Sequence, residues 1–103
     1  MLDNYKGKQA DIVTAFGLLN WLLEDNLSYT KKFIENAWKI TKETLIVDFL
    51  SSYLTTTYDR ELNVYYHNVR DVLDICFELT DNVVMIHDYK PIPQKEFMVV
   101  LKR

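Results

Sequence analysis

Side chains able to hold a polar ligand or move a proton gather in three short stretches of this sequence. The first is a run of hydroxyl groups, SSYLTTTY, at residues 51–58. The second is YYH at residues 65–67, and the third is HD at residues 87–88. Hydroxyl groups donate and accept hydrogen bonds, and imidazole is the side chain used most often for proton transfer. His67 and His87 are therefore the candidate catalytic residues.

Each of these stretches also has a simpler interpretation. His87 could act with Asp88, because a nearby carboxylate raises the basicity of an imidazole. Adjacent residues of a strand point to opposite faces, however, so this pair requires that the strand end before His87. His67 has the alternative of an exposed histidine in a loop. The hydroxyl run is either the mouth of a site at the end of a sheet or a weakly ordered surface loop.

Glycine is scarce, because the chain has only Gly7 and Gly17. Loops that cradle phosphates or dinucleotides need several closely spaced glycines, since only glycine lets the backbone approach the ligand closely. The sequence contains neither a GxGxxG fingerprint nor a P-loop. A nucleotide site built on a glycine-rich loop of this sequence is therefore excluded.

The composition predicts one folded domain spanning residues 1–103, with 49% hydrophobic and 26% charged residues. The formal net charge is −3 and the basic residues are scattered, so no nucleic-acid partner is expected. No apolar run approaches the roughly 20 residues of a membrane helix, so no membrane association is expected.

The chain has one cysteine, Cys76, which excludes a disulfide within the chain. Its neighbours Ile75 and Phe77 are apolar, which favours a core residue over a nucleophile. The first residues, MLDNYKGK, lack the apolar segment of a signal peptide. We expect a reduced cytoplasmic protein, and no metal site is predicted.

Four short apolar runs predict strands, and they lie at residues 10–16, 44–50, 82–87 and 96–103. The first run has the composition of a strand buried on both faces. Helical spacing of apolar residues predicts a helix from about Ser28 to Thr41, with Asp25, Asn26 or Ser28 as its N-cap. A second helix opens at Asn68, and Asp71 three residues later resembles a capping box. Residues 17–26 can form one or two further helical turns.

The predicted order is β-α-β-α-β-β, an α/β fold in which right-handed crossovers make the first three strands parallel. The loop before the last strand is too short for a parallel crossover, so that strand is expected to be antiparallel. Ligands of open α/β sheets bind beyond the carboxyl ends of the parallel strands. The residues that follow these ends are Phe16, Gly17, Asn20 and Trp21, then Ser51, Ser52 and Tyr53, then His87, Asp88 and Tyr89.

Tyr65, Tyr66 and His67 precede the second helix and join the same edge if their loop packs back. Taken singly, most of these residues have a structural explanation. Trp21 is expected to pack in the core or against a helix, and the two tyrosines can simply cover the sheet. The prediction of a wet, mostly apolar pocket rests on their shared edge.

Several motifs, taken in order, resemble a known family. They are ADIVTAFGLLNWL, then FIENAWKI and LIVDFL, then DFLSSY, VYYHNVRDVLDIC and VVMIHDYKP with EFMVVLKR. Together they resemble the C-terminal half of a class I S-adenosylmethionine-dependent methyltransferase, in particular a group of bacterial methyltransferase-like proteins. The resemblance covers nearly all 103 residues. The ordered set is fairly specific, whereas each motif alone is a weak signal.

The resemblance implies a partial Rossmann-like methyltransferase sheet whose last strand inserts antiparallel between its two predecessors. It also implies a cofactor half that precedes residue 1 and carries the glycine-rich loop. S-adenosylmethionine is thus the cofactor of the full-length family, and this chain alone is expected to bind none. Carried over from the family, Ala15, Phe16 and Gly17 lie near the methionine portion of the cofactor. Asn20, Trp21, Ser51, Ser52, Tyr53, Tyr65 and Tyr66 face a small-molecule substrate.

Two functions remain open from the sequence. One is the substrate-side part of a methyltransferase that acts on a small acceptor and is inactive as an isolated chain. The other is a non-catalytic α/β interaction module that associates through its first strand. An exposed strand edge promotes association. We therefore expect the edge of residues 10–16 to be covered in a homodimer or by the missing N-terminal half.

Overall fold

The computed structural model describes residues 9–53, 61–88 and 95–103. Its elements follow the predicted order: β1 (Ala10–Ala15), α1 (Asn26–Lys39), β2 (Thr41–Leu50), α2 (Val69–Phe77), β3 (Val83–Ile86) and β4 (Glu96–Lys102). The threonines of the hydroxyl run, together with Tyr58 and Tyr89, lie outside the described residues. The predicted α/β class is confirmed, and β2 begins three residues earlier than expected.

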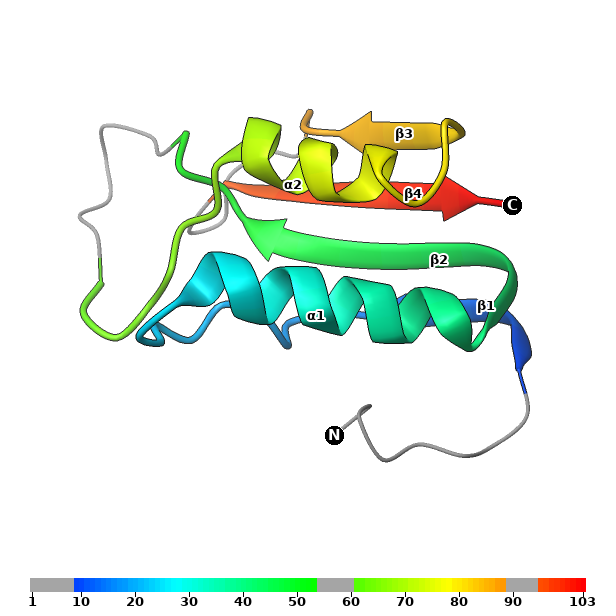
Figure 1. The fold of residues 1–103 in the computed structure, drawn as a ribbon. Coiled ribbons are helices and arrows are strands. Elements are labelled where there is room, and N and C mark those ends of the chain that lie inside the picture. The colour runs from blue at the N-terminus through cyan, green and yellow to red at the C-terminus, as the bar shows by residue number, and fades with distance from the viewer. Residues whose placement is uncertain (1–8, 54–60, 89–94) are drawn as a thin grey trace.

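The four strands form one mixed sheet in the order β1-β2-β4-β3 (Figure 1). β1 and β2 are parallel, and β4 is antiparallel to both β2 and β3. β1, β2 and β3 therefore run in one direction, and their carboxyl ends meet at the same edge of the sheet. The insertion of β4 between its two predecessors confirms the arrangement that the resemblance implied.

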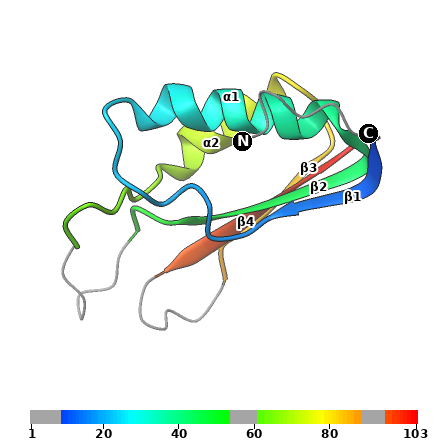
Figure 2. The ribbon, with the colours of Figure 1, turned by 90° about the horizontal axis from the view of Figure 1, so that it is seen from below.

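Both helices cover the same face of the sheet, and the described residues place no helix on the other face (Figure 2). The alternation along β2 and β4 explains this arrangement, because every second side chain turns toward the helices. These side chains are fully buried and belong to Leu45, Val47, Phe49, Phe97, Val99 and Leu101. Ile34 and Ala37 of α1 and Val72, Ile75 and Cys76 of α2 complete the core.

Both helices begin at residues whose side chains cap them. The Asp25 carboxylate accepts hydrogen bonds from the Ser28 backbone N–H at 3.1 Å and from the Ser28 hydroxyl at 2.8 Å. These bonds lower the pKa of Asp25. The Asn68 side chain accepts from the Asp71 backbone N–H at 3.2 Å. Both caps were among those predicted, and they fix the residue at which each helix begins.

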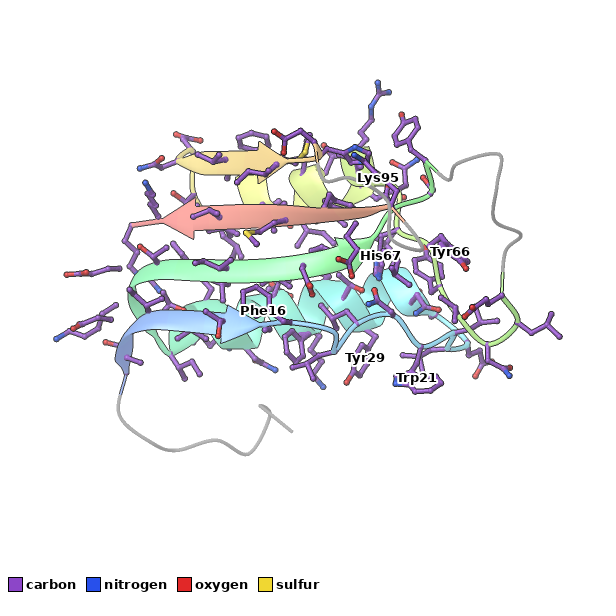
Figure 3. All side chains as sticks on the ribbon, turned by 180° about the vertical axis from the view of Figure 1, so that it is seen from behind. Phe16, Trp21, Tyr29, Tyr66, His67 and Lys95 are labelled. Carbon is purple, nitrogen blue, oxygen red and sulfur yellow. The ribbon has the colours of Figure 1, made fainter. Side chains whose placement is uncertain are left out.

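β1 is not buried on both faces, contrary to the prediction. It is the outermost strand of the described sheet, and all its side chains are exposed except those of Val13 and Ala15. Ala15, which pairs with Val47, is buried, whereas Ile12 on the opposite face is 61% exposed. Phe16 and Trp21 are also exposed along this margin (Figure 3). An apolar run therefore marks a strand, but burial depends on what lies beside it.

The expected helical turns at residues 17–26 do not form ahead of α1. Gly17 adopts φ 70°, a left-handed conformation that glycine tolerates without strain, and residues 18–25 are not helical. The Leu22 N–H donates to the Asn63 carbonyl at 2.8 Å, and the Tyr65 N–H donates to the Asn20 carbonyl at 2.9 Å. Backbone pairing with a distant segment thus replaces local helical bonds. Within the described residues, no helix is long and apolar enough to cross a membrane.

Candidate functional site

The carboxyl ends of β1, β2 and β3 bring together the side chains that the sequence had singled out. Ser51 lies directly after β2, and its Oγ is 2.7 Å from the Nε2 atom of His87, which follows β3. His67 reaches the same edge through a bridge between its backbone and that of Ser51. The shared edge is therefore real, and its details decide which residues can act together.

His87 is oriented by Ser51 rather than by its neighbour Asp88. The Ser51 hydroxyl accepts a hydrogen bond from the Tyr53 N–H at 3.1 Å, so its own hydrogen is available for Nε2 of His87. Nε2 is thus engaged by Ser51, and Nδ1 is the ring nitrogen that Ser51 does not use. The ring stacks on Phe97 at 5.8 Å and meets the edge of Tyr53 at 5.6 Å. Three contacts thus fix its orientation.

His67 is buried, so its interpretation as an exposed loop residue is wrong. Its Nε2 lies 2.6 Å from the Leu19 carbonyl oxygen and donates to it. Its backbone N–H donates to the Leu50 carbonyl at 2.7 Å, and its carbonyl accepts from the Ser52 N–H at 2.9 Å. Burial lowers the pKa of His67, and the bond to Leu19 opposes this only in part. A neutral imidazole therefore ties the loop after β1 to the end of β2.

A small cavity of about 190 Å³ opens beside the ends of β1 and β2. Its lining comprises Gly17, Asn20, Trp21, Leu50, Glu61 and Val64. The Asn20 side-chain oxygen accepts from the Leu50 N–H at 3.0 Å, which fixes this residue in the wall. Trp21 is 69% exposed, so the expectation that it packs in the core is wrong. The backbone of Trp21 forms a bridge with Val64, and its indole stays exposed beside the small cavity.

Asp48 shapes this cavity although the sequence showed it only as an interruption of an apolar strand. Its carboxylate accepts a hydrogen bond from the Gly17 N–H at 2.7 Å and so holds the left-handed turn after β1. Partial burial, together with the charge of Asp48, raises the pKa of Glu96. The role of Asp48 at the Gly17 turn could have been recognised from one signal, an acidic residue near the carboxyl end of a buried strand.

The other residues that the resemblance assigned to the cofactor and the substrate differ in their burial. Ala15 is buried in the core and does not line the small cavity, whereas Phe16 is exposed beside it. Tyr66 is buried, and its hydroxyl accepts from the Glu61 N–H at 3.0 Å. Tyr65 is half-buried, with its ring against His67. Ser52 is half-buried beside the fully buried Ser51.

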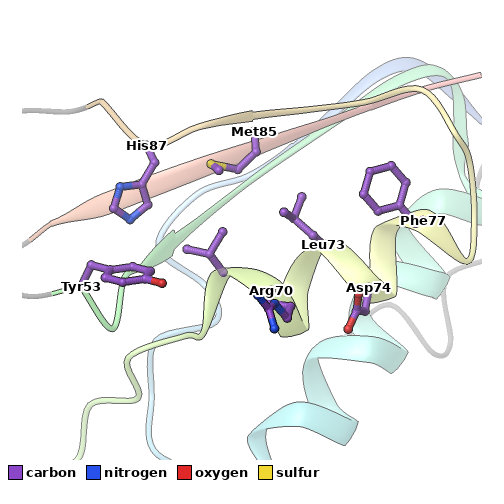
Figure 4. Close-up of a pocket in the computed structure, with 8 residues that line it drawn as sticks. Tyr53, Arg70, Leu73, Asp74, Phe77, Met85 and His87 are labelled. Atoms are coloured by element: carbon purple, nitrogen blue, oxygen red, sulfur yellow. The ribbon is translucent and has the colours of Figure 1, made fainter.

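A second and larger cavity of about 700 Å³ lies between α2 and β3 (Figure 4). It is lined by Tyr53, Val69, Arg70, Leu73, Asp74, Phe77, Met85 and His87. It shares no lining residue with the small cavity, so the residues predicted to line one pocket lie in separate cavities. Sequence reasoning missed this cavity. The apolar stripe of α2 is broad, and the four-residue β3 is too short to cover its flank.

Two further features limit the chemistry. Cys76 is fully buried, and burial raises the pKa of its thiol to about 12, so it is a core residue as predicted. Among the described residues, no three histidine, cysteine or acidic side chains converge as metal ligands. The candidate chemistry therefore rests on hydroxyl, imidazole, amide and carboxylate groups.

The sheet order, with an antiparallel strand inserted next to the last parallel one, is part of a Rossmann-like methyltransferase fold. No protein-family model and no curated protein matches the sequence. The chain is similar to the crystal structure of magnesium protoporphyrin IX methyltransferase from Synechocystis PCC 6803 with bound SAH. The TM-score is 0.71 at 14% identity. The structure of that enzyme with bound SAM gives a TM-score of 0.59, also at 14% identity.

Each match covers nearly all of this chain but less than half of the enzyme. The match with the SAH complex covers 100% of this chain and 48% of the enzyme. The match with the SAM complex covers 97% of this chain and 42% of the enzyme. The chain thus spans less than half the length of the methyltransferase whose fold it shares.

Proposed function

We propose that this chain is the acceptor-side half of an S-adenosylmethionine-dependent methyltransferase that acts on a small polar acceptor. The observation that carries the proposal is the match of all its elements to about half of a solved methyltransferase. The sequence motifs support the C-terminal half, since the chain has no glycine-rich loop. Methyl transfer depends mainly on positioning the acceptor against the methyl group, which this edge of the sheet suits.

The small cavity is the proposed place of transfer. The turn at Gly17, held by Asp48, would approach the methionine portion of the cofactor. Asn20 and Trp21 would then contact the acceptor from the same wall. His67 is buried and does not line this cavity, so it is not placed to accept a proton from the acceptor. Glu61 lines this cavity, and its backbone is held by the bond from its N–H to the Tyr66 hydroxyl, so we assign proton acceptance to the Glu61 carboxylate.

The cofactor half would dock along β1. This strand is the outermost one described, and Ile12, Phe16 and Trp21 expose apolar surface along it. An unpaired strand edge flanked by apolar side chains is suited to receive another strand. The proposed partner is the polypeptide that supplies the remaining strands and the glycine-rich loop of the methyltransferase fold. On this proposal the chain alone binds no cofactor.

Calorimetric titration tests the proposal. S-adenosylhomocysteine added to the chain alone is expected to give no binding heat. Binding is expected in the micromolar range when the polypeptide encoded immediately upstream of Met1 is co-expressed with the chain. Micromolar binding by the chain alone would contradict the proposal that this chain lacks the cofactor half. A Glu61→Gln variant of the complex should bind the cofactor normally but turn over slowly, and normal turnover would overturn the role of Glu61.

The exposed β1 edge also favours a second candidate, a non-catalytic interaction module that pairs with a copy of itself. In a two-fold arrangement β1 of one copy would pair with β1 of the other, giving a continuous sheet. Light scattering at micromolar concentration separates the two proposals. A dimer that persists when the upstream polypeptide is present favours the module, whereas replacement of the dimer by a complex with that polypeptide favours the methyltransferase half.

A further inference from the structure

The larger cavity is a candidate ligand site that methyl transfer does not use. We propose that it binds a small aromatic or alicyclic carboxylic acid, held between α2 and β3. Its volume of about 700 Å³ falls within the roughly 300–1,000 Å³ of small-molecule sites. Such sites combine mostly apolar walls with a few converging polar groups, and this cavity has both.

One end of the cavity is apolar. Leu73 and Phe77 project from α2, one turn apart, toward Met85 of β3 (Figure 4). Phe77 is 50% exposed and Met85 is 36% exposed, so a folded domain leaves two large apolar side chains open to water. A ring seated among them would remove this surface from water, and the flexible methionine can adapt to its outline.

The other end carries hydrogen-bond donors. The Ser51 hydroxyl engages Nε2 of His87, which leaves Nδ1 as the ring nitrogen open to a ligand at the cavity wall. Tyr53 stands against the same ring and also lines the cavity. Arg70 adds a guanidinium group, which pairs with carboxylates through two parallel hydrogen bonds. These three side chains make this end complementary to a carboxylate.

Asp74 sets the direction in which the ligand lies. It follows Arg70 by one helical turn and lines the cavity near Phe77. A ligand carboxylate at that end would face a like charge, whereas at the other end it meets Arg70 and His87. The acid group is therefore expected beside His87, with the ring toward Phe77. Charge placement thus gives the site a polarity that a purely apolar groove lacks.

The site is separate from the proposed place of methyl transfer. The two cavities have no lining residue in common, and Ser51 and His67, both buried, link the strands at their shared edge. Substitutions in one cavity can therefore be compared with substitutions in the other. The proposal does not depend on S-adenosylmethionine or on a partner for β1.

Titration with 2-naphthoate and with the neutral 2-naphthalenemethanol, followed by NMR of the labelled chain, tests the proposal. The acid is expected to bind about tenfold more tightly than the alcohol, because the alcohol carries no negative charge and cannot pair with the guanidinium through two parallel hydrogen bonds. Both probes should shift the amide signals of α2 and β3. An Arg70→Gln variant should reduce the preference for the acid, and Trp21→Ser in the small cavity should leave both affinities unchanged.

Two variants address the apolar end. Met85→Trp should fill the cavity and abolish binding of both probes. Phe77→Ser changes a half-exposed side chain and is expected to keep the fold while weakening both probes about fivefold. Equal affinities for acid and alcohol would overturn the carboxylate assignment. Signal shifts confined to residues around Trp21, or unchanged binding by Phe77→Ser, would overturn the site itself.

Discussion

The two histidines at the carboxyl edge of the sheet show how different two neighbouring regions can be. His67 is buried between the loop after β1 and the end of β2, and its Nε2 donates to a backbone carbonyl. His87 stands in the wall of the larger cavity, and its Nε2 meets the Ser51 hydroxyl. One ring joins chain segments, while the other lines a cavity. The use of an imidazole is therefore decided by the partner of each nitrogen and by access to water.

The largest difference between the two regions is expected in stability. His67→Ala should lower the free energy of unfolding by about 3 kcal/mol, because it opens a cavity and leaves the Leu19 carbonyl unpaired. His87→Ala should cost only about 1 kcal/mol, since its ring is half-buried. Urea denaturation followed by circular dichroism measures both values. Equal losses would remove the distinction between a structural and a cavity histidine.

A His67→Gln variant sharpens this comparison. The glutamine amide can also donate a hydrogen bond to the Leu19 carbonyl, so part of the lost stability should return. Recovery of about 1 kcal/mol relative to alanine would assign that share to the hydrogen bond. If glutamine and alanine are equally destabilising, then packing against Phe49 and Tyr65, which the ring contacts edge-on, is what matters.

The pH dependence of stability should also distinguish the two regions. The pKa of His67 is lowered by burial, so the unfolded chain takes up a proton near pH 6.5 while the folded chain does not. Stability is therefore expected to fall as the pH drops below about 6.5, by at most about 1.4 kcal/mol per pH unit. Protonation stops adding to this loss once the pH is below the folded pKa.

His67→Gln is the matched control for that experiment, because other groups titrate as well. Glu96 has a raised pKa, so its protonation favours the folded state as the pH falls. The lowered pKa of Asp25 acts in the opposite sense, at more acidic pH. Subtracting the urea-denaturation profile of the variant isolates the contribution of His67. Parallel profiles between pH 5 and 7 would show that burial does not shift this histidine.

A smaller effect is expected from Ser51→Ala, which acts on the other region. It removes the hydrogen bond to His87 and leaves the Tyr53 N–H without its acceptor, at a cost of about 1 kcal/mol. Its more specific result is that His87 loses the group that orients its ring. Binding of 2-naphthoate should weaken a few-fold, whereas the neutral alcohol should bind as before. Unchanged binding of the acid would mean that Phe97 and Tyr53 alone hold the ring.

Much of the fold could be predicted because local rules act on it strongly. The helical crossovers after β1 and β2 and the short connection before β4 define the strand directions. Asp25 and Asn68 signal where the helices begin. The division of the edge into two cavities could not be predicted. It depends on His67 meeting Leu19, 48 residues earlier, and on Ser51 meeting His87, 36 residues later. Trp21 was misjudged for the same reason, since its backbone pairs with the distant Val64 and its indole stays exposed.

The smallest effect on stability is expected on the β1 side, where the largest effect on association should lie. Ile12 is 61% exposed and faces away from the helices, so Ile12→Lys should change the unfolding free energy by less than about 0.5 kcal/mol. The added charge should nevertheless block strand pairing along β1, as charges do on natural edge strands. Light scattering should then show a smaller mass for the variant than for the unaltered chain.

Val84→Lys is the matched control for this substitution, because Val84 is 45% exposed on β3, at the opposite margin of the sheet. Association through β1 predicts that Val84→Lys keeps the mass of the unaltered chain. If both variants dissociate, the whole uncovered face of the sheet takes part in association rather than one edge. If the unaltered chain is already monomeric at micromolar concentration, self-pairing of β1 is wrong. The edge would then be left for the proposed cofactor half.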